Sequence, residues 1–253
     1  MIKESEPIDI ILLTHNKLEN TTRCMEALYA NTQLPFILTV IDDSNDETAA
    51  YFDRMCFEKK NIRYHRTKEF IKTANQAINI GLKMTQSDPV IFLTNSSFVE
   101  PDWLPVALRI MEQEPKVGLV GFKLLFPETN TIIEAGEVVL PDGNRPNIGM
   151  HAPSHHFTHI REVNAIGWSA VLIRRAALPE GGLDEDTYIG FRGMDDSDNC
   201  LEMRKRGWKI MYNGYGAVYH KLGACLGGGT EEGRRESAEN YRRFVAKWAG
   251  RVP

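Results

Sequence analysis

Four short runs of apolar and β-branched residues alternate with segments of helical composition in the first hundred residues. The runs span residues 8–13, 36–41, 62–65 and 89–93. Strands that are apolar on both faces and that alternate with helices are typical of a parallel sheet covered on both sides. The sequence therefore predicts an α/β fold with a mainly parallel central sheet and helices on both faces.

Three of these runs stop abruptly at polar loops, which span residues 14–16, 42–46 and 94–97. Open α/β sheets bind ligands at the carboxyl ends of their strands, so residues 1–100 are predicted to form a nucleotide-binding half. Residues 101–225 carry shorter extended pieces and many loops, and residues 226–253 are predicted to form an amphipathic C-terminal helix. The sequence has no repeat or long linker, so we expect one domain over residues 1–253.

The charge balance excludes one broad class of function. The chain carries 30 Lys and Arg residues against 34 Asp and Glu residues, which gives a net charge of −4. Binding to nucleic-acid phosphates needs a surplus of positive charge, so we expect no nucleic-acid partner.

Three further features favour a soluble protein of the reducing cytoplasm. Glu4 and Glu6 precede the first apolar run, whereas a signal peptide begins with basic residues. No apolar stretch approaches the roughly twenty residues that a transmembrane segment needs. The four cysteines are scattered without a Cys-x-x-Cys pair, which disfavours both a zinc ribbon and a disulfide framework.

The motifs of common phosphate and zinc sites are missing. Thr14, His15 and Asn16 follow the first apolar run, where a dinucleotide site would have Gly-x-Gly-x-x-Gly. The glycines at 227–229 lack the Lys-Ser/Thr pair of a phosphate loop, and we interpret them as a hinge. Four histidines lie within residues 151–159 without a His-Glu-x-x-His pattern, so we interpret that segment as an acceptor-site or surface loop.

Seven segments, spread over nearly the whole chain, follow the motif order of one enzyme family. They are residues 10–16, 40–48 (Val-Ile-Asp-Asp-Ser-Asn-Asp-Glu-Thr), 70–77, 164–175, 181–185 (Gly-Gly-Leu-Asp-Glu), 195–198 (Asp-Asp-Ser-Asp) and 218–220 (Val-Tyr-His). In this order they resemble the inverting family 2 glycosyltransferases of GT-A fold, in particular rhamnosyltransferase-like members. The resemblance implies transfer of a hexose-like residue from a UDP-, GDP- or dTDP-sugar to a hydroxyl group of a glycan or other acceptor, as in polysaccharide biosynthesis.

The same resemblance assigns catalysis to Asp196 and Asp195. Asp196 would be the general base that takes a proton from the acceptor hydroxyl, and Asp195 would orient the acceptor or the donor sugar. Both lie at a predicted helix N-terminus, where the helix dipole favours ionised carboxylates, as a base at neutral pH requires. The alternative role for Asp195 is to cap that helix.

The resemblance also implies where the two substrates bind. Asp42 ends a strand, where its carboxylate can accept hydrogen bonds from a base N–H and ribose hydroxyls or can cap its own loop. Trp168 offers an aromatic face to a sugar ring or packs in the core. The predicted nucleotide-sugar-binding residues are Thr14, Asn16, Asp42, Lys72, Asn75, Thr94, Asn95 and Ser96, and the predicted acceptor-binding residues are Trp168, Asp195 and Arg192.

The sequence departs from the family at the metal site. The family's Asp-x-Asp, whose carboxylates hold Mg²⁺ or Mn²⁺ under the donor diphosphate, falls on residues 94–96 (Thr-Asn-Ser). Hydroxyl and amide oxygens alone bind a hard divalent cation weakly. Either such a cation still binds through the diphosphate, His220 and an acidic residue, or the cationic side chains of Lys72, Arg192 and Lys221 stabilise the leaving group.

Two other functions fit parts of the sequence. A catalytically silent relative that only binds a nucleotide or sugar would explain the lost Asp-x-Asp, but it has no chemical reason to keep Asp195, Asp196 and His220. A nucleotidyltransferase would need acidic metal ligands, which the sequence lacks. Peripheral membrane contact is a further option for the basic residues of the C-terminal helix, which are Arg234, Arg235, Arg242, Arg243 and Lys247.

Overall fold

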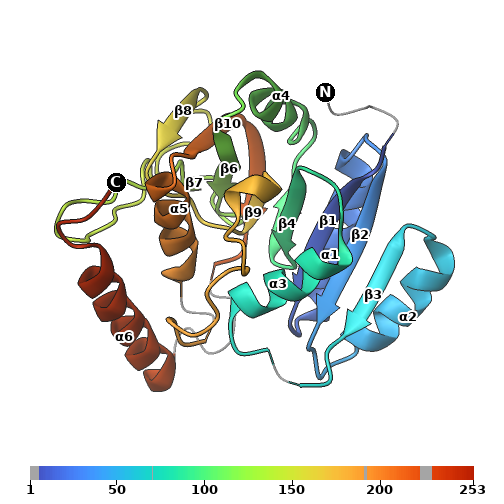
Figure 1. Cartoon of the computed structure of the whole chain (residues 1–253). Coiled ribbons are helices and arrows are strands. Elements are labelled where there is room, and N and C mark those ends of the chain that lie inside the picture. Colours follow the sequence, from blue (N-terminus) through green and yellow to red (C-terminus); the bar gives the residue numbers. More distant parts are fainter. Residues whose placement is uncertain (1–5, 70, 191–192, 223–229) are drawn as a thin grey trace.

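The computed structural model describes residues 6–69, 71–190, 193–222 and 230–253, which build one continuous sheet with flanking helices (Figure 1). The strands are β1 (Ile8–Thr14), β2 (Phe36–Asp42), β3 (Ile62–Arg66), β4 (Val90–Thr94), β5 (Ser97–Val99), β6 (Val117–Leu125), β7 (Ile132–Glu134), β8 (Ile160–Val163), β9 (Ala170–Ile173) and β10 (Lys209–His220). The helices are α1 (Leu18–Asn31), α2 (Thr48–Glu58), α3 (Ala74–Met84), α4 (Pro105–Gln113), α5 (Asp195–Lys205) and α6 (Glu231–Trp248), with a 3₁₀ turn η1 (Arg175–Ala177). The predicted α/β fold class is confirmed.

The first half of the sheet is parallel. β1 pairs with β2 on one side and with β4 on the other, and β2 pairs with β3. In this register Thr14 lies beside Asp42, and Leu13 lies beside Thr94. The polar loops after these strands therefore meet at one edge of the sheet, as expected for parallel strands.

The second half of the sheet is mixed, and one strand joins it to the first half. The strand order is β3-β2-β1-β4-β9-β6-β10-β5, with β7 beside β6 and β8 beside β10. β9 runs antiparallel to both β4 and β6, whereas β6 and β10 are parallel to each other. β9 thereby couples the two halves of the predicted domain through backbone hydrogen bonds.

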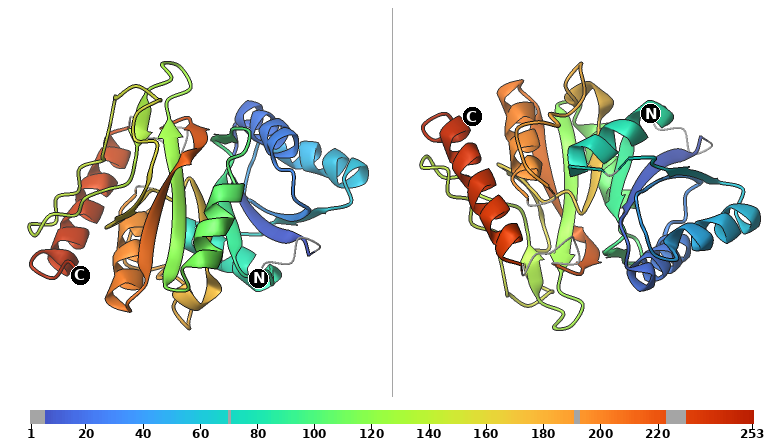
Figure 2. Two further views of the ribbon diagram at one scale, coloured as in Figure 1. Left: turned by 90° about the horizontal axis from the view of Figure 1, so that it is seen from above. Right: turned by 90° about the horizontal axis from the view of Figure 1, so that it is seen from below.

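Each face of the sheet carries its own apolar core, because successive residues of a strand point to opposite faces. Ile10 and Leu12 of β1 belong to the core that includes α1, α2 and α4, whereas Ile11 and Leu13 belong to the core that includes α3, α5 and α6. Figure 2 shows helices along both faces of the sheet. The continuous apolar pattern of β1 is explained by burial on both sides.

Two of the helices begin at a side-chain cap. α3 begins at Ala74 and is capped by Thr73, whose Oγ1 accepts a hydrogen bond from the Gln76 N–H at 3.2 Å. α6 spans Glu231–Trp248, within the segment 226–253 predicted to form the C-terminal helix, and Thr230 caps it in the same way through the Gly233 N–H. Within residues 163–173, β8 ends at Val163 and β9 begins at Ala170, so the segment contributes to two separate strands. The glycines at 227–229 lie outside the described residues.

Three basic residues of α6, Arg242, Arg243 and Lys247, form ion pairs within the protein. Arg243 Nε lies 2.7 Å from Glu239 Oε1, and Arg242 also contacts Glu239. Lys247 Nζ lies 2.9 Å from Asp198 Oδ2. None of the described helices has the length and apolar character needed to cross a membrane.

A buried carboxylate fastens α6 to α5. Asp198 Oδ1 accepts hydrogen bonds from the Trp248 indole N–H at 2.6 Å and from the Tyr188 hydroxyl at 3.1 Å, while Oδ2 pairs with Lys247. Asp198 is buried, so its charge depends on these partners. The last acidic residue of the 195–198 segment therefore holds the C-terminal helix in place.

Replacing Asp198 with Ala is expected to lower the free energy of unfolding by about 3 kcal/mol, because two buried donors lose their acceptor and Lys247 loses its main partner. The control Glu202→Gln removes only the half-exposed Lys247–Glu202 pair and is expected to change stability by less than about 0.5 kcal/mol. Urea denaturation of both variants measures the difference. Equal stabilities would contradict the anchoring role of Asp198.

Candidate active site

The carboxylate of Asp42 ties three strand ends together. Oδ1 accepts hydrogen bonds from Thr14 Oγ1 at 2.7 Å and from both the N–H and the hydroxyl of Ser44, and Oδ2 accepts one from the Tyr64 hydroxyl at 2.7 Å. Thr14 and Asp42 are both fully buried. The prediction that these two side chains contact a nucleotide directly does not fit their burial. Both side chains bond to neighbouring strand ends instead.

The loop after β1 is held against the loop after β2 by polar contacts. His15 Nδ1 lies 2.6 Å from Asp43 Oδ1, and the Asn16 N–H donates to Ser44 Oγ at 2.7 Å. Asn16 adopts a left-handed backbone with φ of 54°, and its Oδ1 accepts a hydrogen bond from the Asn45 N–H. The pairing of His15 with Asp43 was not anticipated from the sequence, although both residues lie in segments that the motif comparison singles out.

The residues at the family's Asp-x-Asp positions bond to one another and to their neighbours. Thr94 Oγ1 lies 2.9 Å from Ser97 Oγ and 3.2 Å from Ser96 Oγ. The Asn95 amide donates to the Asn16 carbonyl and to Thr21 Oγ1. Thr94 and Asn95 are half-buried, whereas Ser96 is buried.

His220 completes this hydroxyl-rich group. Its Nδ1 lies 3.4 Å from Ser96 Oγ and 3.3 Å from Ser97 Oγ. Burial lowers the pKa of His220 to about 4, so the imidazole is neutral at physiological pH.

These residues do not fit a divalent-cation site. The donor set consists of hydroxyls, one amide and one neutral imidazole, and a hard cation prefers carboxylates. Within the described part of the chain, no group of three His, Cys, Asp or Glu side chains is placed to hold a metal ion. The histidines within residues 151–159 likewise belong to no such group among the described residues.

A second group of polar side chains gathers where β7 meets the start of α5. It contains four carboxylates, from Glu134, Glu137, Asp195 and Asp196, and we call it the acid group. The Gly167 N–H donates to Glu134 Oε1 at 2.7 Å, and the next N–H, that of Trp168, donates to Asp196 Oδ2 at 3.0 Å. Two consecutive peptide groups thus hold two carboxylates.

Burial raises the pKa values of Glu134, Asp195 and Asp196. The pKa of Asp196 is raised to about 8, first by desolvation and then by the charge of Asp195. The pKa of Glu134 is also raised to about 8, by desolvation and then by the charge of Glu137, and that of Asp195 is raised mainly by burial. At both aspartates desolvation outweighs the predicted effect of the helix dipole on the pKa, and at Asp196 the charge of Asp195 adds to the upward shift.

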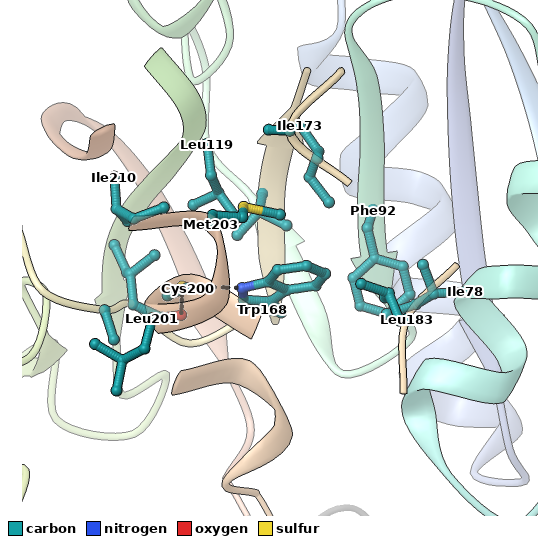
Figure 3. Close-up of a cluster of buried hydrophobic side chains, with 14 of the residues drawn as sticks. Ile78, Phe92, Leu119, Trp168, Ile173, Leu183, Cys200, Leu201, Met203 and Ile210 are labelled. Atoms are coloured by element: carbon teal, nitrogen blue, oxygen red, sulfur yellow. Dashed lines mark hydrogen bonds between the residues drawn. The ribbon is translucent and has the colours of Figure 1, made fainter. Parts of the chain in front are cut away.

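Trp168 is a core residue. Its side chain is 1% exposed, and its indole N–H donates to Cys200 Sγ at 3.4 Å. Figure 3 shows the ring among apolar side chains of α5 and of β4, including Met203 and Phe92. The prediction that this ring stacks on an acceptor sugar is wrong, since the ring offers no accessible face; only the backbone N–H of Trp168 reaches the acid group.

The remaining predicted residues have different settings. Asn75 is buried, donates to the Asp184 carbonyl at 2.7 Å and accepts from the Asn199 amide at 2.8 Å, so it packs α3 against α5 and does not face a ligand. Lys72 is exposed just before α3. Arg192 lies outside the described residues.

Glu134→Gln tests the buried acid group. Folding favours the protonated form of Glu134, so its contribution to stability is lost as the pH rises from that of an ordinary carboxyl towards 8 and beyond. Gln stays neutral and keeps an oxygen for the Gly167 N–H. We expect the variant to melt above the wild type at about pH 9, by about 2–4 °C per kcal/mol of removed penalty, and to differ little at about pH 5.

Calorimetric melting at both pH values, with the exposed Glu112→Gln as control, measures this difference. The same shift at both pH values would contradict a buried carboxyl group that ionises with difficulty.

Known proteins resemble this chain in sequence over different lengths. The uncharacterized protein y4gI of Sinorhizobium fredii is 25% identical over 251 residues, which cover 94% of this chain and 26% of that protein. The O-antigen biosynthesis protein RfbC of Myxococcus xanthus is 34% identical over 130 residues, 45% of this chain and 10% of RfbC. The glucosyl-dolichyl phosphate glucuronosyltransferase of Haloferax volcanii is 23% identical over 238 residues, 85% of this chain and 69% of that enzyme.

Solved structures share the fold at low sequence identity. The crystal structure of GalNAc-T7 with UDP, GalNAc and Mn²⁺ has a TM-score of 0.73 at 14% identity and covers 95% of this chain and 48% of GalNAc-T7. The mannosyltransferase PcManGT of Pyrobaculum calidifontis, solved with GDP-Man and Mn²⁺, has a TM-score of 0.67 at 16% identity and covers 96% of this chain and 65% of PcManGT. The expected GT-A fold is confirmed.

The family is shown by a match over more than half of the chain. The model described as glycosyl transferase family 2 matches residues 9–176, a range that includes the whole sheet edge from β1 to β4 and the peptide groups that hold Glu134 and Asp196. The rhamnosyltransferase-like subtype stays a prediction. On this match and this fold, the chain belongs to glycosyl transferase family 2.

Proposed function

We propose that this chain is an inverting hexosyltransferase in which Asp196 is the general base. The observation that carries the proposal is the setting of Asp196 in the first turn of α5, half-buried, with Oδ2 held by the Trp168 N–H. A raised pKa near the operating pH suits a group that must take up a proton during the reaction and release it afterwards. Membership of the family supports glycosyl transfer as the reaction class.

In the proposed reaction the ionised Asp196 takes the proton of the acceptor hydroxyl. The acceptor oxygen forms a bond to the anomeric carbon while the bond from that carbon to the diphosphate oxygen breaks. The electron pair of the broken bond leaves with the nucleoside diphosphate, and attack from the opposite face inverts the anomeric centre. Asp195, which precedes the base, orients the acceptor or the donor sugar.

The donor is proposed to be a UDP-, GDP- or dTDP-sugar bound by residues 1–100. Neighbours in fold were solved with UDP, with GDP-Man and with UDP-GlcNAc, which supports a nucleoside diphosphate sugar. At the sheet edge the accessible candidates for donor contact are Asn16, Lys72, Thr94 and Asn95. The acceptor, bound by residues 101–225, is proposed to be a hydroxyl group of a glycan, and the name of RfbC supports polysaccharide biosynthesis.

We propose that charge on the leaving diphosphate is stabilised mainly by cationic side chains. Neighbours in fold were solved with Mn²⁺. The cluster of hydroxyl side chains around His220, however, offers that ion no carboxylate. Lys72 and Lys221 are both exposed and are candidates for this role. A cytoplasmic location also stays a prediction.

A catalytically silent sugar-binding relative is the second candidate. The bonded hydroxyls at residues 94–96 favour it, because they replace the carboxylates of a metal-dependent enzyme. The acid group around Asp196 favours catalysis, because three buried carboxylates beside a fourth, half-buried one lower stability and contribute nothing to a binding module.

Asp196→Asn is expected to lower kcat at least about 100-fold, because general-base catalysis contributes that much or more. Donor affinity should stay unchanged, since the variant leaves the sheet edge intact. Release of nucleoside diphosphate and formation of glycoside are measured together with calorimetric donor binding. Asp186→Asn, an exposed change in the same region, is the matched control and should keep full activity. A kcat within twofold of the wild type would remove Asp196 from the mechanism.

Removal of divalent cations tests the proposed metal independence. We expect glycoside formation in excess EDTA to stay within about threefold of the rate with Mn²⁺, because the chain offers the ion few ligands of its own. A metal-dependent member of the family, assayed in the same buffers, controls for incomplete chelation. Loss of activity in EDTA that Mn²⁺ restores would show that the diphosphate and this weak donor set suffice to bind the ion.

A further inference from the structure

Arg145, which lies in a loop distant in sequence, forms a hydrogen bond to the first turn of α5. Arg145 Nη1 lies 2.5 Å from Glu137 Oε1 and 3.0 Å from Ser197 Oγ, and Arg145 Nε lies 3.2 Å from Met194 Sδ. Ser197 Oγ in turn donates to Glu137 Oε2 at 2.5 Å. Arg145, Glu137 and Ser197 therefore form a closed triangle of hydrogen bonds.

This triangle flanks the catalytic pair of the proposed function. Met194 directly precedes Asp195 and Asp196, and Ser197 directly follows them. Glu137 and Ser197 are buried, and the Arg145 side chain is only 20% exposed, so the contacts are shielded from solvent. The triangle fixes the start of α5 on both sides of the pair.

The same arginine supplies positive charge to the acid group. Asp196 faces Asp195 on its own helix, Glu134 on β7, Glu137 in the segment after β7, and Arg145. The three carboxylates favour the protonated form of Asp196, whereas Arg145 and the Trp168 N–H favour the ionised form. Arg145 acts in the same direction on Glu134 and Asp195.

We propose that Arg145 is the positioning residue of this enzyme, which orients the first turn of α5 through Glu137 and Ser197 and keeps Asp196 available as a base. This inference rests on the proposed role of Asp196. Arg145 acts through its neighbours, and its effect has two separable parts: the hydrogen bonds that hold the helix and the charge that offsets Glu137.

Charge compensation separates this role from a merely structural one. Arg145→Met leaves the Glu137 charge buried and unpaired, so we expect kcat/KM at neutral pH to fall at least about 10-fold and the acid limb of the pH profile to move to higher pH. Adding Glu137→Gln removes that charge and keeps an acceptor for Ser197. The double variant Arg145→Met/Glu137→Gln should therefore regain most of the lost activity, with its acid limb close to that of the wild type.

Three further variants and a second measurement complete the test. Arg145→Lys keeps the charge and should fall between the wild type and Arg145→Met. Arg235→Met, which removes an exposed arginine of α6, should behave as the wild type. Infrared difference spectra should show more protonated carboxyl in Arg145→Met at neutral pH, and Asp196→Asn in that background should remove part of the signal.

The outcomes distinguish this inference from the proposed function. An unshifted acid limb and an unchanged infrared signal in folded Arg145→Met, or no recovery in the double variant, would overturn the role of Arg145. If the wild type transfers no sugar but the infrared signal changes as expected, the control of Asp196 by Arg145 holds and the proposed function fails. Melting temperatures establish that each variant is folded.

Discussion

Three residues ahead of β9 connect the two polar groups of this protein. The N–H groups of Gly167 and Trp168 hold Glu134 and Asp196, and the carbonyl of Ser169 accepts hydrogen bonds from the Thr94 N–H at 3.0 Å and from Ser97 Oγ at 2.9 Å. β9 then pairs with β4 and β6. The backbone of one short segment thus sets the separation between two clusters of side chains: the hydroxyl side chains around His220 at the sheet edge, and the carboxylates around Asp196 at α5.

The buried indole of Trp168 anchors this segment in the core. The ring packs in the core between α5 and β4, and its N–H is satisfied by Cys200. The backbone N–H of the same residue donates to Asp196 Oδ2 at 3.0 Å. Trp168 therefore contributes to the site through packing and backbone geometry, which differs from the sugar-stacking role that its residue type suggests.

Local sequence patterns were sufficient to predict elements whose own run of residues determines their burial. The continuous apolar runs predicted β1, β2, β3 and β4, and the parallel order that they indicated brings the polar loops after β1, β2 and β4 to one edge of the sheet. The antiparallel direction of β9 was not predictable, because a four-residue apolar run carries no signal of direction. Glu134 and Glu137 were missed for a similar reason: they lie about sixty residues from α5, and only the folded sheet brings them to Asp196.

The acid group also shows how tertiary burial overrides a local electrostatic rule. Three acidic residues in the first turn of a helix predict stabilised, ionised carboxylates. In the folded chain, desolvation raises the pKa values of Asp195 and Asp196, and the charges of Asp195 and Glu137 add to the shift at Asp196, while Asp198 pairs with Lys247 and anchors α6. The same three-residue pattern therefore yields one structural anchor and one candidate catalytic pair.

We propose that the edge formed by β1, β2 and β4 binds a nucleoside diphosphate sugar. Isothermal titration with a panel of UDP-, GDP- and dTDP-sugars, in EDTA and in Mn²⁺, tests it most directly. We expect saturable heat with at least one member of the panel, and comparable affinity in both buffers. Absence of binding by every donor in both buffers would contradict both the transferase and the silent sugar-binding relative.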